Sequence, residues 1–271
     1  MKLIAVDLDG TLLNHSKEVL ESSRQAIAAA AAAGVQVVVA SGRSFPEAQR
    51  FVAGTACSEH VICAGGAAIV NRTSGVSRHT WYLDCQTAAR VLRQGTACGM
   101  AAFAYTANQI WMEEADYNAI FSNMPGFRAQ RDILHLCDGL PEAIAAHGMD
   151  VAKIMCWSLD QDRQRQTRAR LSAIPGLSFT SSGPDNFEVL AAGAGKGMAL
   201  RWLAQALGIP REETAAIGDA ENDLDMLAEA GYAVAMGNAA ACVKAQADFV
   251  TGDCESDGIA RALTWLMERN M

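Results

Sequence analysis

The sequence LIAVDLDGT at residues 3–11 puts a short apolar run directly before two aspartates, a glycine and a threonine. The run from Leu3 to Leu8 has the length of a buried β-strand, and Val35 to Ala40 and His60 to Cys63 are two more runs of this kind. Helical segments separate these runs, which indicates βαβ units. We therefore expect an α/β fold whose core is a doubly wound, parallel sheet.

Capping residues mark the helix boundaries in this region. Strong helix formers fill Glu18 to Ala33, and Gly34 stands where a left-handed residue commonly ends a helix. Ser44 and Glu47 form a capping box, and Pro46 supports a helix start at the same place. The last third of the chain repeats this alternation. There we expect strands at Thr214–Ile217 and Tyr232–Ala235, and helices at Lys196–Leu207, Asn222–Ala230 and Asp257–Met267.

The middle of the chain follows a different pattern. Between about Asp84 and Pro184 the apolar runs are weaker and more amphipathic, which predicts a small α+β domain. We expect this cap domain, residues 84–184, to be inserted into a core of residues 1–83 and 185–271, with hinges at Tyr82–Asp84 and Gly183–Asn186. Its expected strands are Ala101–Tyr105, Ile110–Glu113 and Val151–Trp157, and its expected helices are Thr87–Cys98, Leu140–His147 and Asp162–Ser172.

Composition excludes several classes of protein. The 271 residues are 51% hydrophobic and 19% charged, so the chain is not disordered and has enough apolar residues to form a core. A net charge of −8 argues against nucleic-acid binding. No apolar window has the length of a membrane span, and no signal peptide is evident, so we expect a cytoplasmic protein. The eight cysteines form no C-x-x-C pair and the five histidines show no metal-binding spacing, so we expect most cysteines to be buried as small apolar residues and the histidines to have surface or structural roles.

The first candidate site residues are Asp7 and Asp9, at the carboxyl end of the first predicted strand. Side chains two residues apart in an extended segment point the same way, so these two carboxylates should lie together. They need a cation or a proton to offset their repulsion, and carboxylate oxygens suit Mg²⁺. The alternative is an ordinary solvated acidic loop.

Other polar clusters follow strands or open helices of the same predicted core. Asp219 would complete an acidic metal site with Asp7, and Asn222 and Asp223 lie about one turn further on. The segment Ser41–Arg43 follows the second strand, where a hydroxyl and a backbone N–H can bind phosphate oxygens. Lys196, after two glycines, opens a helix. Their convergence on one sheet edge favours a phosphate site over separate surface residues.

These motifs resemble those of the haloacid dehalogenase superfamily, and within it the Cof-type phosphatases with a large inserted cap. The matching segments are DLDGTLL at 7–13, SGR at 41–43, GKG at 195–197 and GDAEND at 218–223. The resemblance covers nearly the whole chain, and only the expected cap lacks specific motifs. It implies that Asp7 attacks phosphorus and becomes an aspartyl-phosphate, and that Asp9 protonates the leaving group and then activates water.

The resemblance also implies the binding residues. Mg²⁺ would be held by Asp7, the carbonyl of Asp9 and Asp219. Ser41, Gly42 and Lys196 would bind the phosphoryl group. The residues that would surround this set are Thr11, Arg43, Asn222 and Asp223.

Two positions depart from the family pattern. Gly65 stands where Cof-type proteins usually have Asn, and Gly195 stands where Ser is common before the lysine. The first change removes a side chain near the substrate, and the second weakens the helix cap by a few tenths of a kcal/mol.

The function expected from the sequence is a Mg²⁺-dependent phosphatase of small phosphorylated metabolites, such as sugar phosphates or compounds like pyridoxal phosphate. A phosphomutase and a non-catalytic phosphometabolite-binding regulator are the alternatives. Trp111, Glu113 and Tyr117 in the cap are candidates for substrate specificity, although aromatic residues in a small domain are often core. The sequence indicates neither the physiological substrate nor the oligomeric state.

Overall fold

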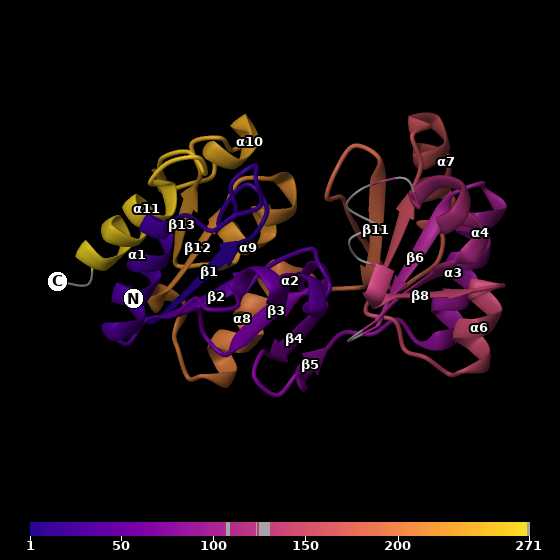
Figure 1. The fold of residues 1–271 in the computed structure, drawn as a ribbon, viewed down its shortest axis with the longest axis horizontal. Helices are drawn as coiled ribbons and strands as arrows, with labels where there is room; N and C mark the ends of the chain where they lie inside the picture. Colours follow the sequence, from indigo (N-terminus) through magenta and orange to yellow (C-terminus); the bar gives the residue numbers. More distant parts are fainter. Residues whose placement is uncertain (107–108, 123, 125–130, 270–271) are drawn as a thin grey trace. The chain divides into compact units, whose positions relative to one another are not determined.

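The computed structural model describes residues 1–106, 109–122, 124 and 131–269, and it divides into two compact units. The first unit comprises Met1–His79 and Gly195–Met271, and the second is Thr80–Ala194 (Figure 1). The second unit is thus inserted between two segments of the first.

The first unit is built on an eight-stranded sheet in the order β14-β13-β12-β1-β2-β3-β4-β5. Parallel pairing joins β14 through to β3, while β4 runs antiparallel to β3. The parallel core confirms the predicted fold class, whereas the hairpin that adds β4 was not predicted. The strands are β1 (Leu3–Asp7), β2 (Gln36–Ala40), β3 (His60–Cys63), β4 (Ala68–Asn71), β5 (Ser77–Thr80), β12 (Thr214–Gly218), β13 (Tyr232–Ala235) and β14 (Phe249–Val250).

Helices cover this sheet. The strand order runs outward from β1 in both directions, so right-handed crossovers put the helices of the two halves on opposite faces. Helix α1 packs against α11, and α8 packs against α9. The expected capping box is present at α2, where Ser44 N–H and Oγ both donate to Glu47 Oε2. The helices are α1 (Glu21–Ala32), α2 (Phe45–Val52), α8 (Lys196–Ala206), α9 (Leu224–Glu229), α10 (Ala241–Lys244) and α11 (Gly258–Glu268).

The second unit contains a six-stranded mixed sheet in the order β10-β11-β9-β6-β7-β8. One apolar cluster joins a face of this sheet to α3 and α6, and a second cluster covers the other face. The strands are β6 (Ala101–Tyr105), β7 (Ile110–Glu113), β8 (Leu134–Cys137), β9 (Lys153–Trp157), β10 (Leu177–Thr180) and β11 (Asn186–Ala191), and the helices are α3 (Cys85–Ala97), α4 (Glu114–Asp116), α6 (Leu140–Ala146) and α7 (Gln161–Leu171).

The boundaries of the second unit differ from the expected 84–184. Strand β11 pairs with β9 and β10, so the unit extends to Ala194. At the other end, Leu83 bridges Val151, and Asp84 caps α3 through the N–H groups of residues 86 and 87. The segments expected as hinges therefore lie inside the second unit.

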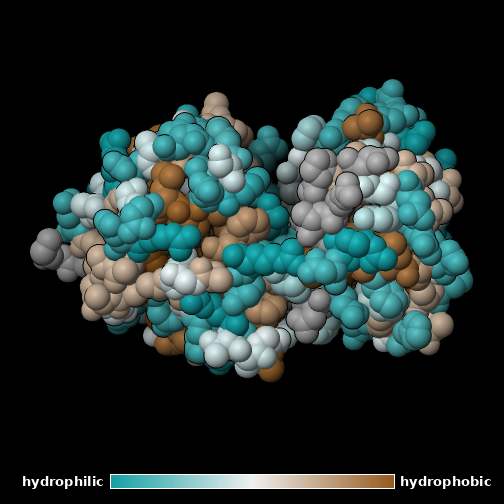
Figure 2. Space-filling model, viewed as in Figure 1, coloured by the Kyte–Doolittle hydropathy of each residue, from teal (hydrophilic) through white to brown (hydrophobic). Residues whose placement is uncertain are grey.

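One face of the molecule shows mainly hydrophilic residues (Figure 2). Figure 2 shows polar residues over most of the face in view, with apolar residues scattered among them. Among the residues that the structure describes, the large apolar side chains that are exposed are Val76, Tyr82, Leu159 and Val250. Within the described residues, every helix is too short or too polar to cross a bilayer.

Gly66 allows the close approach of two segments that build the candidate site. Its φ is +92°, and a Cβ at this position would lie 2.1 Å from the carbonyl carbon of Gly195, directly before α8. Residue 66 therefore has to be glycine for Lys196 to be placed where it is.

The substitution Gly66→Ala should destabilise the protein far more than Gly54→Ala. Gly54 also has a positive φ, but nothing lies within 4 Å of its would-be Cβ, so alanine there meets backbone strain of only about 1 kcal/mol. At Gly66 the backbone clash adds to that strain, for a loss of about 3 kcal/mol or more in unfolding free energy. Urea unfolding measures both values, and equal losses would contradict the proposed close contact.

Candidate active site

The loops after β1, β2 and β12 meet at one edge of the first unit's sheet. Asp7 pairs in register with Ala40, and Val6 pairs with Ile217. Ser41 and Asp219, which directly follow these strands, are therefore brought beside Asp7. Parallel strands of an α/β sheet place their carboxyl ends together in this way, as the sequence predicted.

Lys196 links two buried carboxylates at this edge. Its Nζ donates to Asp7 Oδ1 and to Asp223 Oδ1, both at 2.6 Å, and all three side chains are buried. Burial opposes the charged form of Lys196, but the charges of Asp223 and Asp7 outweigh it and raise the lysine's pKa. Burial and the charge of Asp223 raise the pKa of Asp7 despite Lys196. Negative charge is therefore in excess here.

Asp223 orients the loop that follows β12. Its Oδ1 is bonded to Lys196, and its Oδ2 accepts hydrogen bonds from the N–H groups of Asp219 and Ala220, each at 3.0 Å. Both oxygens of Asp223 are thus already used, which fits a supporting role beside the site. Asn222 lies in the same 3-10 turn, Glu221–Asp223.

Asp219 belongs to the same cluster as Asp7 and Asp223. Its Oδ1 accepts a hydrogen bond of 2.8 Å from Thr11 Oγ1. Burial raises the pKa of Asp219 to about 6, and the charge of Asp223 adds to the rise. A buried carboxylate of this kind favours a nearby cation.

The acidic cluster has the composition of a divalent-cation site. Carboxylate oxygens of Asp7, Asp219 and Asp223 lie within 4.8 Å of one another. Among the described residues, no hydrogen bond is made to the second oxygen of Asp7 or Asp219, nor to the carbonyl of Asp9. Three carboxylates around one lysine leave charge for a divalent ion, and oxygen ligands suit Mg²⁺. The residues therefore fit such an ion.

Asp9 lies in a different environment from Asp7. Strand β1 ends at Asp7, so the alternation expected to place both carboxylates on one side does not reach Asp9. Arg43 binds the Asp9 carboxylate through Nε at 2.7 Å and Nη2 at 2.8 Å, and Lys17 Nζ binds it at 2.8 Å. Burial raises the pKa of Asp9, but these two cations outweigh it and lower the pKa to about 2.

Ser41 is fully buried between β2 and β3. Its N–H donates to the carbonyl of Ile62, and its hydroxyl accepts a hydrogen bond from the N–H of Arg43 at 3.1 Å. Since the Ser41 N–H is taken, its hydroxyl is the group it offers to a phosphate oxygen. Gly65, the departure from the family pattern, has a φ of +71° and donates its N–H to the Ser41 carbonyl.

The glycine at position 195, where serine is common in the family, is explained by its neighbour Asp225. The N–H of Gly197, in the first turn of α8, donates to Asp225 Oδ2 at 3.0 Å. A Cβ on residue 195 would lie 2.4 Å from that same oxygen. Asp225 thus supplies the capping bond that a serine at position 195 would otherwise make, and it fixes the start of the helix that carries Lys196.

The three specificity candidates in the second unit are not brought together. Trp111 is buried in the cluster on one face of the sheet, and its indole N–H donates to Gln109. Tyr117 is buried in the cluster on the other face. Glu113 accepts the N–H groups of Gly139 and Leu140 at the start of α6. Each side chain therefore has a structural role, because the small domain uses its aromatic residues for its core.

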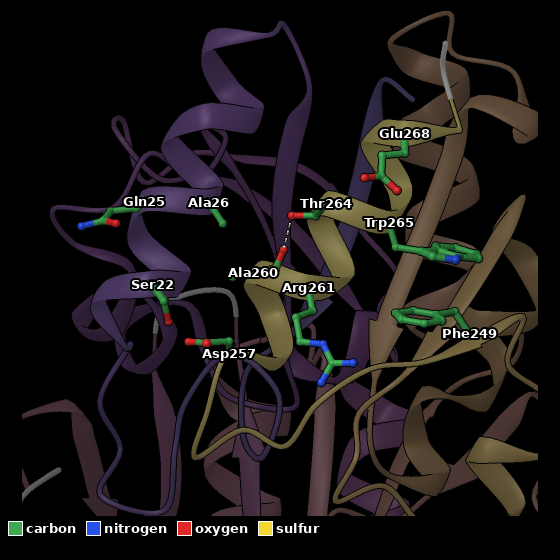
Figure 3. A pocket seen from close by; sticks show the side chains of 10 residues that line it. All are labelled: Ser22, Gln25, Ala26, Phe249, Asp257, Ala260, Arg261, Thr264, Trp265 and Glu268. Carbon is green, nitrogen blue, oxygen red and sulfur yellow. Dashed lines mark hydrogen bonds between the residues drawn. The ribbon is translucent and has the colours of Figure 1, made fainter.

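A groove of about 630 Å³ lies between α1 and α11, but its lining does not favour it as the active site. Figure 3 shows its lining residues, which come from α1, from α11 and the residue before it, and from Phe249 of β14. Arg261 is the cation among its lining residues, and Asp257 and Glu268 are also there. It lacks the convergence of strand ends that marks the acidic cluster.

Sequence reasoning missed three supporting residues. Lys17 lies in a loop with a φ of +62°, Asp225 lies in a helix, and Asn238 donates from its Nδ2 to the carbonyl of Gly10 at 2.7 Å. Lys17 and Asn238 approach the loop of Asp9, and Asp225 approaches that of Lys196. No short spacing signals such contacts, because the partners come from different loops.

Comparisons of the sequence and of the structure with known proteins lead to the same family. The family model for haloacid dehalogenase-like hydrolases matches residues 4–263. The chain is 31% identical to the 5-amino-6-(5-phospho-D-ribitylamino)uracil phosphatase YcsE of Bacillus subtilis, over 98% of this chain and 96% of that protein. It is 28% identical to the pyridoxal phosphate phosphatase YbhA of Escherichia coli, over 96% of each. A solved haloacid dehalogenase-like hydrolase from B. subtilis matches with a TM-score of 0.86 and 30% identity, covering 97% and 99% of the two chains.

The affinity of the acidic cluster for Mg²⁺ should depend on pH through Asp219. With a pKa of about 6, Asp219 holds a proton below that pH in the metal-free protein, and the ion has to displace it. The pKa of Asp7, the other carboxylate expected to hold the ion, is raised to about 8. The affinity should therefore be highest above about pH 8, fall below it, and fall more steeply below about pH 6, where Asp219 also holds a proton. Calorimetric titration at several pH values measures it. A slope that does not steepen below about pH 6 would show that Asp219 does not bind the ion.

Proposed function

The chain belongs to the haloacid dehalogenase-like hydrolases and is a Cof-type phosphatase, and we propose that it hydrolyses small phosphorylated metabolites through an aspartyl-phosphate on Asp7. The observation that carries this proposal is the buried Asp7 carboxylate, held by Lys196 at the edge where the loops after β1, β2 and β12 meet. It rests also on the match of the motifs with the family.

Asp7 is arranged to attack phosphorus. Lys196 fixes one of its oxygens, so the other is available for in-line attack on the phosphoryl group. The ammonium also offsets the charge of an arriving phosphate, because Lys196 lies between two carboxylates and is held in the charged form. The hydroxyl of Ser41 and the backbone of Gly42 would bind the phosphoryl oxygens beside it.

Mg²⁺ is the cofactor that we propose for the acidic cluster. Asp7, Asp219 and the carbonyl of Asp9 would hold it, with Asp223 orienting the loop of Asp219. When bound, the ion would neutralise charge on the phosphoryl oxygens and so allow a carboxylate to approach phosphorus. The excess of negative charge around Lys196 is the structural reason for an ion at this place.

Asp9 would act as the acid and then the base, but only after a change of partners. A carboxyl with a pKa of about 2 is ionised near neutrality and has no proton to give. Its bonds to Arg43 and Lys17 hold it in that form. We infer that Asp9 leaves these two cations when substrate binds, which would raise its pKa and let it protonate the leaving oxygen.

The substrate class follows from the relatives and from the inserted second unit. The relatives named above act on a phosphorylated ribitylaminouracil and on pyridoxal phosphate. We propose a substrate of this size, a sugar phosphate or a phosphorylated heterocycle, and assign its selection to residues of the second unit. A cytoplasmic location, where such metabolites occur, stays a prediction.

The variant Asp7→Asn should lose at least about 10³-fold in turnover, since it removes the attacking oxygen and a metal ligand together. p-Nitrophenyl phosphate with Mg²⁺ is the assay, and near-ultraviolet circular dichroism checks the fold. Asp162→Asn, a change of the same kind at an exposed ion pair with Arg165, is the matched control and should keep full activity. Retention of a tenth of the wild-type rate by Asp7→Asn would reject Asp7 as the nucleophile.

Exchange of residues 80–194 for the second unit of another family member should transfer its substrate ranking. Activity toward p-nitrophenyl phosphate, which asks little of the second unit, should fall much less. An exchange of residues 84–184 is the control, because it separates β11 from β9 and should lower stability. If the 80–194 exchange lowers the activity toward all substrates by one factor and keeps their order, substrate selection does not reside in this unit.

A further inference from the structure

A second group of metal-ligating side chains lies in the first unit, beside the loop of Asp9. It consists of His15, Cys254 and Glu255, whose ligand atoms (a ring nitrogen, Sγ and a carboxylate oxygen) lie within 4.8 Å of one another. The acidic cluster offers oxygen atoms, whereas this group offers one nitrogen, one sulfur and one oxygen. The two groups therefore suit different ions.

The three side chains are already partly assembled. Glu255 Oε1 lies 3.0 Å from His15 Nδ1 and accepts the backbone N–H of His15 at 2.6 Å. The thiol of Cys254 is buried next to them, while the His15 and Glu255 side chains are 77% and 46% exposed. The group is thus open to solvent on one side, where an ion can enter and keep a water ligand.

Backbone contacts fix the loop that carries Cys254 and Glu255. Cys254 N–H donates to Asn238 Oδ1 at 3.0 Å, and Gly237 N–H donates to the carbonyl of Gly252 at 2.8 Å. A Cβ on Gly258 would lie 2.6 Å from that same carbonyl oxygen, so the two segments are packed without space between them. The backbone that carries the Cys254 thiol is therefore held in place by the fold.

The loop that carries His15 is also closed by its own hydrogen bonds. Asn14 N–H donates to the carbonyl of Glu18, Glu18 N–H donates to Asn14 Oδ1 at 2.8 Å, and Lys17 N–H donates to the carbonyl of Asn14. Small adjustments of the exposed His15 and Glu255 side chains suffice to bring their ligand atoms to about 2.0–2.3 Å from a bound ion, the distances that zinc requires.

We propose that His15 Nδ1, the Cys254 thiolate and the Glu255 carboxylate form a binding site for a transition-metal ion of the Zn²⁺ class, which inhibits the enzyme. Imidazole and thiolate are ligands that such ions prefer and Mg²⁺ does not. Binding replaces the S–H bond of Cys254 by a metal–sulfur bond and releases the proton to water. A water molecule completes the tetrahedral set.

Inhibition follows from the position of Lys17, two residues after His15. Lys17 Nζ holds Asp9 Oδ1 at 2.8 Å. An ion that ties His15 to the fixed loop of Cys254 restrains the loop 14–18, and so keeps Lys17 on Asp9. This step rests on the proposed function, in which Asp9 has to leave Lys17 to act as an acid. The binding of the ion does not depend on it.

Cobalt(II) is the probe for binding, added to the whole protein in excess Mg²⁺. A thiolate ligand gives a sulfur-to-cobalt charge-transfer band, which the oxygen ligands of the acidic cluster cannot produce. The wild type should show the band. Cys254→Ser should lose it, and His15→Ala, a change at an exposed side chain, should bind at least about tenfold more weakly. Cys242→Ser removes an exposed thiol outside the group and should leave the band unchanged.

Binding at this place is overturned if Cys254→Ser keeps the wild-type band or if Cys242→Ser abolishes it. The inhibitory role is tested by Zn²⁺ titration of p-nitrophenyl phosphate turnover in excess Mg²⁺. Zn²⁺ should inhibit the wild type at concentrations at least about tenfold below those that inhibit Cys254→Ser. Equal inhibition of both would overturn the regulatory role. Failure of the proposed function itself would show separately, as retention of a tenth or more of the wild-type rate by Asp7→Asn.

Discussion

The contact of Lys196 with Asp7 and Asp223 is the interaction on which the rest of the site depends. An ammonium buried this completely is tolerated only when carboxylates compensate its lost hydration. That requirement fixes the start of α8 against the ends of β1 and β12. Gly66 lets its own segment approach the backbone of Gly195, directly before α8, and Asp225 caps α8 at the same point. The fold thus places a fully buried charge where its loops converge.

Asp7 and Asp9 are two residues apart and have opposite environments. Asp7 is buried among like charges, so its pKa rises, while Asp9 is bound by Arg43 and Lys17, so its pKa falls to about 2. The two carboxyls are thereby prepared for different tasks, one beside a metal ion and one that has to exchange partners. The difference arises because β1 ends at Asp7 and the chain turns before Asp9.

The sequence predicted the elements that follow the repeated alternation of strands and helices. Strand-length apolar runs located β1, β2 and β13, and the parallel sheet then brought Asp7, Ser41 and Asp219 to one edge. It did not predict contacts of loop residues that do not directly follow a predicted strand. His15 and Glu255 are 240 positions apart, so no spacing rule reveals their cluster. Lys17 likewise shows no signal, since its role depends on where its loop folds.

Strand β11 escaped prediction for an electrostatic reason that also explains the extent of the second unit. Glu188 interrupts its apolar pattern, yet it is buried and paired with Lys153 of β9 at 2.8 Å. In the observed register Glu188 lies opposite Met155 and diagonal to Lys153. A one-residue slip would turn this carboxylate into the apolar cluster on the opposite face without a partner. The pair therefore specifies the register of β11 and binds residues up to Ala194 to the inserted domain.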